Sequence, residues 1–442
     1  MAQITLCIAS ERTESQEVIT LLRVIAGSKS EKRVAIRTLS RHWQDGYIAP
    51  LIELLRLNTD AVVQDDIVKL LQRKTRKRFG ADYQRWHQWS WSQNLAPLEN
   101  YAEFKAWLYG NIDPHFRAYF ASHHALKIRL DEVLWGGVKQ DGIPPLRNPK
   151  MIAVNQASYL DDSNVVFAIE VNGAYRAYPK RIMGWHEMFV DTVGGVELVG
   201  VYCTLCGAMI VYETYADGVN HQFGTSGFLY RSNKLMYDKK TQSLWNSFWG
   251  QPVIGPLVDK GISLQRRSVV TTTWGAWRIR HPDTTVVSLQ TGYDVNYGEG
   301  VAYKKYFATD ELMFKVPRLD DRLKNKAEVL GIFMSTDELP LAEPLAISAQ
   351  YLEHNPLYYD TLSGMEIVVL TDLSGANRVY EGDVKFVSWN KNNRLMDSHG
   401  RIWTMTESAL QGEKGQRLNR IPAHRAFWFG WYSAFGNTRL VH

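Results

Sequence analysis

Residues 165–178 read VVFAIEVNGAYRAY, two runs rich in β-branched and aromatic residues on either side of Asn172-Gly173. Asn-Gly is preferred in two-residue hairpin loops, because both central residues of a type I′ turn need a positive φ. The flanking runs have the length and composition of strands. The stretch therefore predicts a β-hairpin, and similar short apolar runs punctuated by turn residues continue from residue 141 onward.

A weak internal repeat divides this β-rich part in two. The run DTVGGVELV (residues 191–199) can be aligned with DTLSGMEIV (residues 360–368). Two further blocks match in the same order, residues 235–245 with 395–403 and residues 277–287 with 431–441. Because the three blocks keep one order, we expect two copies of one β module, over residues 150–310 and 325–442.

Residues 16 to about 78 predict short amphipathic helices. Apolar residues recur at helical spacing in four segments, which are separated by short polar breaks: 18–25, 34–43, 51–55 and 62–71. Paired helices of this length stack as an α-solenoid, in which each pair buries its apolar face against its neighbours. Aromatic residues are frequent in the next segment, residues 95–135, which predicts a helical connector.

The end of the helical part is similar to the end of many HEAT-repeat arrays. The matching residues, within LLQRKTRKRFGADYQRWHQW (70–89), are Phe79, Gly80, Asp82, Trp86 and Trp89. We therefore expect a HEAT-like cap over residues 1–92, through which a protein partner would bind, and a connector over residues 93–149. The predicted fold class is α+β, with this helical segment followed by two related β-rich modules.

The overall composition excludes several classes of protein. The chain has 442 residues, 45% hydrophobic and 22% charged, which is typical of a globular protein with two or three domains. No apolar run approaches ~18 residues, so we expect no membrane span. The net charge of +5 is small and evenly spread, so we expect no nucleic-acid partner. The start, MAQITLCIASERTESQ, predicts no signal peptide, and the sequence alone indicates a cytoplasmic location.

Two of the three cysteines form the most informative motif. Cys203 and Cys206 lie in a Cys-x-x-Cys-Gly sequence between two strand-like runs, whereas Cys7 is far away in the sequence. In a thioredoxin-like motif the pair opens a helix, which is a different context. A tight turn with two inward sulfurs is typical of a metal knuckle, but a structural zinc site needs two more ligands. Three interpretations stay open: a metal site, a redox-active dithiol or disulfide, and a simple turn.

His186 is the natural third ligand. It precedes the strand that leads into the cysteines, so a chain that doubles back would place it beside both sulfurs. A site of two sulfurs and one imidazole suits copper or zinc. Glu187 would orient the metal-bound histidine or act as a general base. His221 is a weaker candidate for a fourth ligand. The alternative for His186 is ordinary packing beside a tryptophan.

The second copy of the repeat retains the scaffold and lacks these chemical groups. His186 aligns with Asn355, Cys203 with Asp372, and Cys206 with or next to Gly375. The positions kept in the second copy are those expected to hold the fold: Asp360, Gly364, Trp403 and Trp431. This pattern favours an active module, residues 150–310, paired with a degenerate, structural one.

Several further motifs follow one another in the first module. They are Gly136-Gly137-Val138, Asp141-Gly142-Ile143-Pro144, Ala177-Tyr178-Pro179, Trp185-His186-Glu187, Asp191-Thr192-Val193-Gly194-Gly195, Tyr202-Cys203-x-x-Cys206-Gly207, Phe223-Gly224-x-Ser226-Gly227 and Met236-Tyr237-Asp238 through Ser243-Leu244-Trp245. Over about residues 136–285 the chain thereby resembles the bacterial and archaeal domain-of-unknown-function family number 3179, with a weak second copy to residue 442. The resemblance implies a β-rich fold and a motif set with a histidine and a cysteine pair, but no reaction. Family members often begin with a signal sequence, and Thr204 stands where proline is common.

The sequence therefore predicts a metal-binding or redox centre, made of His186, Cys203 and Cys206 with Glu187 beside them. Whether the centre is catalytic stays open at this point, as do the substrate and the oligomeric state. Two alternatives belong to other classes. In one, the helical repeat recruits a partner and the knuckle only holds a loop; in the other, the cysteines form a thiol–disulfide centre without metal.

Overall fold

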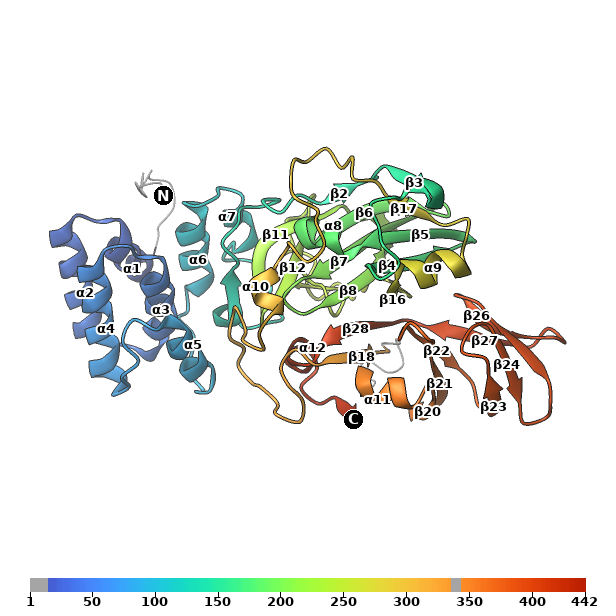
Figure 1. Cartoon of the computed structure of the whole chain (residues 1–442). Helices are drawn as coiled ribbons and strands as arrows, with labels where there is room; N and C mark the ends of the chain where they lie inside the picture. The colour runs from blue at the N-terminus through green and yellow to red at the C-terminus, as the bar shows by residue number, and fades with distance from the viewer. Residues whose placement is uncertain (1–14, 335–342) are drawn as a thin grey trace.

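The computed structural model describes residues 15–334 and 343–442. A stack of helices lies at one end and a larger β-rich part at the other, so the fold class is α+β, as predicted (Figure 1). None of the helices within the described ranges is long and apolar enough to cross a bilayer. The predicted helices are present, with bounds α1 (Gln16–Ala26), α2 (Lys29–Arg41), η1 (Asp45–Tyr47), α3 (Ile48–Leu57), α4 (Ala61–Thr75) and α5 (Tyr83–Trp91).

The helices pair through apolar faces, and α2, α4 and α5 begin at polar caps. Helix α1 packs against α2, and α3 packs against α4 and α5. The Ser28 side chain and Glu31 form a capping box at the start of α2, and Asp60 accepts a hydrogen bond from the Val62 amide at the start of α4. Helices over residues 16–119 agree with the predicted solenoid-like segment, but the likeness to HEAT repeats rests on these helices alone.

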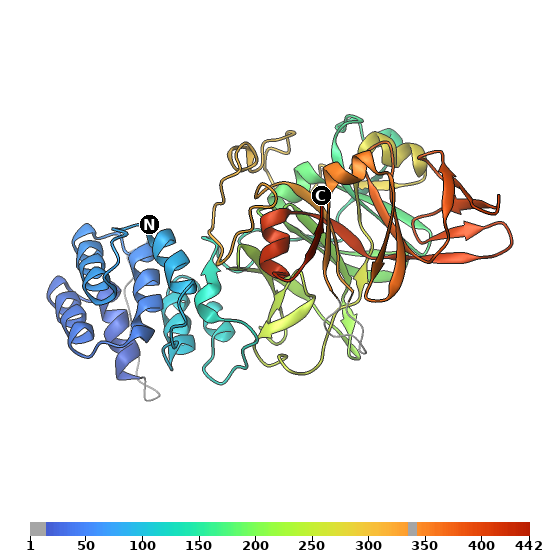
Figure 2. The ribbon, with the colours of Figure 1, turned by 90° about the horizontal axis from the view of Figure 1, so that it is seen from below.

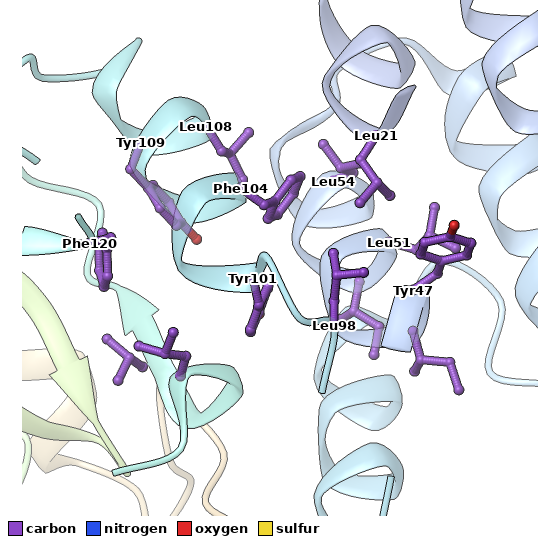
Figure 3. Packing of buried hydrophobic residues seen from close by; sticks show 14 of the residues in the cluster. Leu21, Tyr47, Leu51, Leu54, Leu98, Tyr101, Phe104, Leu108, Tyr109 and Phe120 are labelled. Atoms are coloured by element: carbon purple, nitrogen blue, oxygen red, sulfur yellow. The ribbon is translucent and has the colours of Figure 1, made fainter. Parts of the chain in front are cut away.

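The connector is helical only in its first part. Helices α6 (Tyr101–Gly110) and α7 (Phe116–Tyr119) are followed by η2 (Leu130–Glu132), β1 (Val133–Trp135) and β2 (Leu146–Arg147). The predicted helical connector over residues 93–149 thus contains short strands at its end. Strand β1 pairs with a strand of the β-rich part, and a run of three residues is too short to be recognised from its pattern. Leu54, Phe104, Tyr109 and Phe120 lie in a core that continues onto the sheet (Figure 3).

The first module contains the predicted hairpin. Asn172 and Gly173 have φ of 50° and 81° and join β4 to β5, as an Asn-Gly turn requires. The elements are β3 (Met151–Ala153), η3 (Val154–Gln156), β4 (Val165–Val171), β5 (Ala174–Pro179), α8 (Lys180–His186), β6 (Met188–Val193), β7 (Val196–Cys203), β8 (Ala208–Glu213), β9 (Tyr215–Ala216), β10 (Val219–Asn220), β11 (Phe223–Tyr230), β12 (Asn233–Asp238), β13 (Leu244–Asn246), β14 (Gln251–Ile254), β15 (Arg266–Arg267), β16 (Val270–Thr273), α9 (Trp274–Arg280), β17 (Thr285–Val287) and α10 (Lys304–Phe307). Together with β1 and β2 they form three five-stranded sheets, β16-β4-β5-β17-β3, β15-β8-β7-β6-β2 and β1-β11-β12-β13-β14, and a two-stranded sheet, β10-β9.

The second module lies below the first in Figure 1 and in front of it in Figure 2. Its elements are β18 (Glu328–Ile332), β19 (Leu345–Ser348), α11 (Ala349–His354), β20 (Leu357–Leu362), β21 (Met365–Thr371), β22 (Asn377–Glu381), β23 (Phe386–Trp389), β24 (Arg394–Asp397), β25 (Ile402–Met405), β26 (Ala409–Gly412), β27 (Arg417–Ile421), β28 (Ala423–Phe427), α12 (Trp428–Ala434) and β29 (Arg439–Val441). They form a four-stranded sheet, β28-β18-β19-β29, and an eight-stranded sheet, β20-β21-β22-β27-β26-β25-β24-β23.

The two modules share part of their topology. The order β16-β4-β5-β17 in the first corresponds to β28-β18-β19-β29 in the second, with an antiparallel pairing at each of the first two steps and a parallel one at the third. Trp277 Nε1 donates to Thr284 Oγ1 at 2.9 Å, and Trp431 Nε1 donates to Thr438 Oγ1 at 2.9 Å. In each module, the same hydrogen bond therefore joins a tryptophan of the corresponding helix to a threonine that follows that helix.

The modules also contact each other reciprocally. The turn after β7, residues 203–207, packs on β28 and α12 of the second module, where the Phe427 amide donates to the Cys206 carbonyl at 2.7 Å. The turn after β21 packs on β16 and α9 of the first module, where Ala376 joins the core around Trp274 and Trp277. Each module thus supports the corresponding turn of the other, as in a pseudo-twofold interface.

Candidate functional site

Glu187 and the cysteine turn are brought together by one antiparallel pairing. Strand β6 pairs with β7 so that Met188 lies opposite Val201, and the Tyr202 amide donates to the Glu187 carbonyl at 2.8 Å. The chain therefore doubles back as the sequence predicted. Glu187 itself ends helix α8 in the left-handed region, with φ of 55°, an uncommon conformation for a residue with a side chain. This turn directs its carboxylate toward the end of β7.

The two cysteine sulfurs lie in direct contact. Cys203 Sγ and Cys206 Sγ are 2.8 Å apart, which is longer than the roughly 2.05 Å of a disulfide, so the two cysteines are adjacent and not joined by an S–S bond. Both residues are buried, with 3% and 0% of their surface exposed. The Ser232 carbonyl oxygen faces both sulfurs, at 3.8 Å from Cys203 and 3.5 Å from Cys206. The two sulfurs are therefore buried side by side and share one polar neighbour.

The environment makes the two thiols unequal. Burial acts to raise the pKa of Cys203, but hydrogen bonds from the Cys206 thiol and from the Lys234 and Cys206 backbone amides outweigh it, so the pKa is lowered. Burial raises the pKa of Cys206 well above its usual value, and the hydrogen bond to Cys203 and its negative charge add to the effect. Of the two sulfurs, Cys203 is therefore the one that loses its proton more readily, and Cys206 is the one that keeps it.

Glu187 is held by three neighbours next to this pair. One carboxylate oxygen accepts hydrogen bonds from the Thr204 hydroxyl at 2.8 Å and the Tyr303 hydroxyl at 2.6 Å. The other forms an ion pair with the Lys234 ammonium. Glu187, Thr204 and Lys234 are all buried. A buried carboxylate needs such partners, because an unpaired charge in this environment would be strongly unfavourable.

A small cavity connects this polar cluster to the molecular surface. It has a volume of about 70 Å³. Its polar lining is Glu187, Cys203, Thr204, Lys234 and Tyr303, and its apolar lining includes Val138, Ile143, Phe228, Leu229, Met313 and Phe314. Met313 is 47% exposed, which places the outer end of the cavity at this residue. Of the two described cysteines, the lining includes only Cys203, so Cys206 lies behind it.

The helical segment contributes to the outer end of the cavity. The Arg56 guanidinium of α3 lies 5.5 Å from the centroid of the Phe314 ring, and Gln84 of α5 donates to the Met313 carbonyl at 3.3 Å. Arg56 also donates to the Trp135 carbonyl at 2.5 Å, one residue before the cavity-lining Gly136. The position of the loop that carries Met313 and Phe314 therefore depends on helices α3 and α5.

His186 does not line the cavity that contains Cys203. Its Nδ1 is 2.9 Å from the Pro144 carbonyl oxygen, and its Nε2 is hydrogen-bonded to the Tyr297 hydroxyl. Burial lowers its pKa. Residues 15–334 and 343–442 contain no group of three or more His, Cys, Asp or Glu side chains placed to hold a metal ion. In this geometry the predicted set of His186, Cys203 and Cys206 is therefore not assembled.

The remaining candidates have other places. His221 Nδ1 lies 2.9 Å from an Asp238 carboxylate oxygen and lines a different cavity, so it does not join the cysteine pair. Cys7 lies outside the described residues. Sequence reasoning missed Lys234 and Tyr303. Lys234 could have been noticed as a lysine in the strand-like run NKLMYD (233–238), whose next residues are apolar. Nothing in the local sequence around Tyr303 indicates contact with Glu187.

The corresponding turn of the second module carries a buried ion-pair network. Arg378 donates to Asp372 at 2.8 Å and to both carboxylate oxygens of Glu407, at 2.7–3.0 Å. His281, which follows α9 directly, lies 3.2 Å from Glu407, and the Ser374 hydroxyl lies 3.0 Å from that of Thr272. Every charge in this network has an opposite partner, so the turn links the two modules and offers no reactive group.

Comparison with known proteins places the chain in a family. The profile described as "Protein of unknown function (DUF3179)" matches residues 140–438, which is more than half of the chain. The chain belongs to the DUF3179 family. The match extends over both β modules and includes the cysteine turn, Glu187 and Lys234, whereas helices α1 to α7 precede it. No curated protein and no solved structure matches the chain.

Proposed function

We propose that Cys203 and Cys206 form a thiol–disulfide redox centre, with Cys203 as the attacking thiolate and Cys206 as the resolving thiol. The observation that carries this proposal is the 2.8 Å contact between a cavity-facing sulfur and the sulfur behind it. The pKa of Cys203, which lines the cavity, is lowered, and the pKa of Cys206, which lies behind it, is raised. A two-step exchange needs this arrangement, because the accessible sulfur must attack first and the buried sulfur second.

The reaction is a two-electron oxidation of the pair. The Cys203 thiolate attacks the electron acceptor, forms a covalent bond to it and releases its leaving group, which takes up a proton. Cys206 then attacks Cys203 Sγ and the S–S bond forms. The rest of the acceptor departs with its bonding electrons and with the proton of the Cys206 thiol. Closing the disulfide requires the sulfurs to approach by roughly 0.75 Å, from 2.8 Å to about 2.05 Å.

Glu187 and Lys234 act here as positioning residues. Glu187 accepts from Thr204, which lies between the two cysteines, and it is paired with Lys234, whose backbone amide donates to Cys203. The ion pair therefore holds both the turn and the strand that supplies a hydrogen bond to the thiolate. This role takes the place of the expected one, in which Glu187 would orient a metal-bound histidine.

A metal ion held by the two sulfurs, copper or zinc, is the second candidate. Two adjacent buried sulfurs favour it, since soft ions prefer thiolates. Two thiolates in tetrahedral zinc geometry are about 3.8 Å apart for Zn–S distances of ~2.3 Å. The sulfurs would therefore have to separate by about 1 Å from their present 2.8 Å, and His186 would have to leave both of its hydrogen bonds. The dithiol needs neither change.

The expected protein partner of the helical segment stays a prediction. What supports a role for this segment in the redox centre is its contact with the loop at the outer end of the cavity, through Arg56 and Gln84. We propose that α3 and α5 fix this loop and thereby the access to Cys203.

Thiol trapping tests the proposed function. Protein purified without a metal-affinity tag would be reduced with dithiothreitol, freed of reductant, exposed to oxidised glutathione or hydrogen peroxide, and alkylated before peptide mass spectrometry. We expect a Cys203–Cys206 disulfide that is 2 Da lighter than the reduced pair. Absence of this disulfide with every oxidant, together with one equivalent of bound zinc or copper, would replace the redox centre with the metal site.

A further inference from the structure

The geometry of the cavity restricts the size of the oxidant. Cys203 is 3% exposed, so a thiolate at this position is out of reach of a disulfide on a protein surface. The cavity of about 70 Å³ has room for on the order of five water-sized groups, since one water needs ~10–15 Å³ of such space. Exchange with a disulfide also requires the attacking sulfur and both sulfurs of the partner to lie in line. The cavity is too small to admit a disulfide whose two sulfurs are each attached to a peptide chain.

The lining of the cavity restricts the charge and chemistry of the oxidant. The path from Met313 inward passes apolar side chains, among them Val138, Phe228 and Phe314. Such walls favour an uncharged molecule, because a charged one would lose its hydration. At the inner end, the Lys234 ammonium and the Tyr303 hydroxyl lie with Cys203 in the same lining. This arrangement suits an oxidant whose leaving group becomes negatively charged and then takes up a proton, because an ammonium and a hydroxyl group lie beside the sulfur.

We propose that the oxidant of Cys203 is a small uncharged hydroperoxide. This inference rests on the proposed redox function of the cysteine pair and names its substrate class. The thiolate of Cys203 attacks the terminal oxygen, the S–O bond forms and the O–O bond breaks. The leaving hydroxide or alkoxide takes a proton from the Lys234 ammonium and departs as water or an alcohol, which leaves a sulfenic acid on Cys203. Lys234 then regains a proton from solvent.

Cys206 completes the reaction. Its sulfur attacks the sulfenic sulfur, the S–S bond forms, and the hydroxyl group departs with the proton of the Cys206 thiol as water. In total, one hydroperoxide and the dithiol give one disulfide, one water and one further water or alcohol. The starting separation of 2.8 Å means that the resolving sulfur is already in place when the sulfenic acid forms. Overoxidation to a sulfinic acid is therefore suppressed by rapid disulfide closure.

The test compares two oxidants of different size on the reduced full chain. Disulfide formation at Cys203 and Cys206 would be followed by quenching with alkylating reagent, using hydrogen peroxide or oxidised glutathione at equal concentration. We expect hydrogen peroxide to be at least about tenfold faster, and faster than its reaction with free cysteine at the same pH. In Cys206→Ser, dimedone should label Cys203 after peroxide treatment, because the sulfenic acid persists.

Variants of Lys234 test the proton donor. Lys234→Met should slow the peroxide reaction by at least tenfold, Lys234→Arg should restore part of the rate, and Lys240→Met, at an exposed lysine outside this cavity, should match the wild type. If Lys234→Met does not fold, dimedone labelling in Cys206→Ser decides independently. A disulfide that forms as fast with oxidised glutathione as with peroxide overturns the hydroperoxide proposal but keeps the redox centre. No disulfide with either oxidant overturns the redox centre itself.

Discussion

The two β modules present the same kind of turn to each other, but only one turn carries reactive groups. The turn at residues 203–207 contains the cysteine pair and packs on β28 and α12. The turn at residues 372–376 packs on β16 and α9 and contains Asp372, whose charge is neutralised by Arg378. One four-strand order and the supporting tryptophan are alike in both. The difference shows that the scaffold positions a turn, and that a few side chains in the turn determine whether chemistry is available.

Burial has different consequences for the pKa values of the ion-pair network and of the cysteine pair. In the second module, burial acts to raise the pKa of Glu407, but the charge of Arg378 and hydrogen bonds from His281 and Arg378 hold it well below its usual value. In the first module, the hydrogen bonds to Cys203 stabilise its thiolate, while the burial of Cys206 keeps a proton on the second sulfur. In one turn the charged groups have opposite partners, whereas in the other one sulfur loses its proton more readily than its neighbour does.

The largest expected effect is on disulfide formation, and it distinguishes a single substitution in one turn from a single substitution in the other. Cys203→Ser should abolish disulfide formation at Cys206 completely, since no second sulfur lies within reach among the described residues. Ser374→Ala, in the corresponding turn, should leave the rate of disulfide formation unchanged. The measurement is peptide mass spectrometry after oxidation. A comparable loss of disulfide in Ser374→Ala would mean that the two turns are not functionally distinct.

Removal of the central cation should destabilise the second module. Arg378→Ala removes the cation that pairs with the buried carboxylates of Asp372 and Glu407. Removing one partner of a buried ion pair lowers the free energy of unfolding by about 3–5 kcal/mol. Arg278→Ala, which breaks an exposed pair with Asp162, should cost no more than about 1 kcal/mol. Urea unfolding of both variants gives the comparison. Equal, small losses would show that the network contributes nothing to the link between the modules.

The pH dependence of this loss has a definite sign. Because the pKa of Glu407 is lowered in the folded protein, its ion pairs contribute stability above the ordinary carboxyl pKa, and this contribution is lost as the pH falls through the lowered pKa. The stability difference between wild type and Arg378→Ala should therefore narrow in strongly acidic buffer. A difference that widens on acidification would contradict the assignment of Glu407 as the ionised partner.

A smaller effect is expected where the second module contacts the cysteine turn. A Cβ on Gly430 of α12 would lie 2.9 Å from Cys206 Cβ and 3.2 Å from its sulfur, so the turn must shift. Gly430→Ala should cost about 1–3 kcal/mol, as overpacking does, and slow disulfide closure. In Gly436→Ala the new Cβ meets only an ordinary contact, at 3.7 Å, so this variant is the control. If both variants oxidise at the wild-type rate, the second module does not position Cys206.

The smallest expected effect is a shift in the pH dependence of Cys203. Cys206→Ala removes a hydrogen bond that lowers the pKa of Cys203, so the midpoint of its alkylation rate against pH should move to higher pH. Cys206→Ser retains a donor and should give a smaller shift. Alkylation followed by mass spectrometry at a series of pH values measures both. A midpoint that moves to lower pH in Cys206→Ala would show that Cys206 does not stabilise the thiolate.

Much of the fold was predictable because local patterns specify it. The Asn172-Gly173 turn, the amphipathic helices and the α+β class all follow from spacing and turn chemistry, and each is present. The doubling back of the chain at Glu187 also followed, since β6 and β7 form a hairpin around Gly194-Gly195. These features depend on residues that are close in the sequence.

The composition of the site was only partly predictable. Cys203, Cys206 and Glu187 could be found from motifs, but Tyr303 reaches Glu187 from 116 residues away, and Gly430 reaches Cys206 from the second module. His186 was expected beside the sulfurs, yet the Pro144 carbonyl and the Tyr297 hydroxyl bind its two nitrogens. A sequence pattern indicates the helix or strand on which a side chain lies, but it does not determine which residues from distant parts of the chain will bind that side chain.

A redox titration tests the central claim most directly. The full chain would be equilibrated in thiol–disulfide buffers spanning roughly −350 to −150 mV, and the thiols of Cys203 and Cys206 trapped and counted by mass spectrometry. The dithiol centre predicts one two-electron transition, in which both cysteines lose their free thiols together and about 30 mV changes the ratio tenfold. Two cysteines that stay reduced across the whole range, or that are protected from trapping by an equimolar bound metal until a chelator is added, would contradict it.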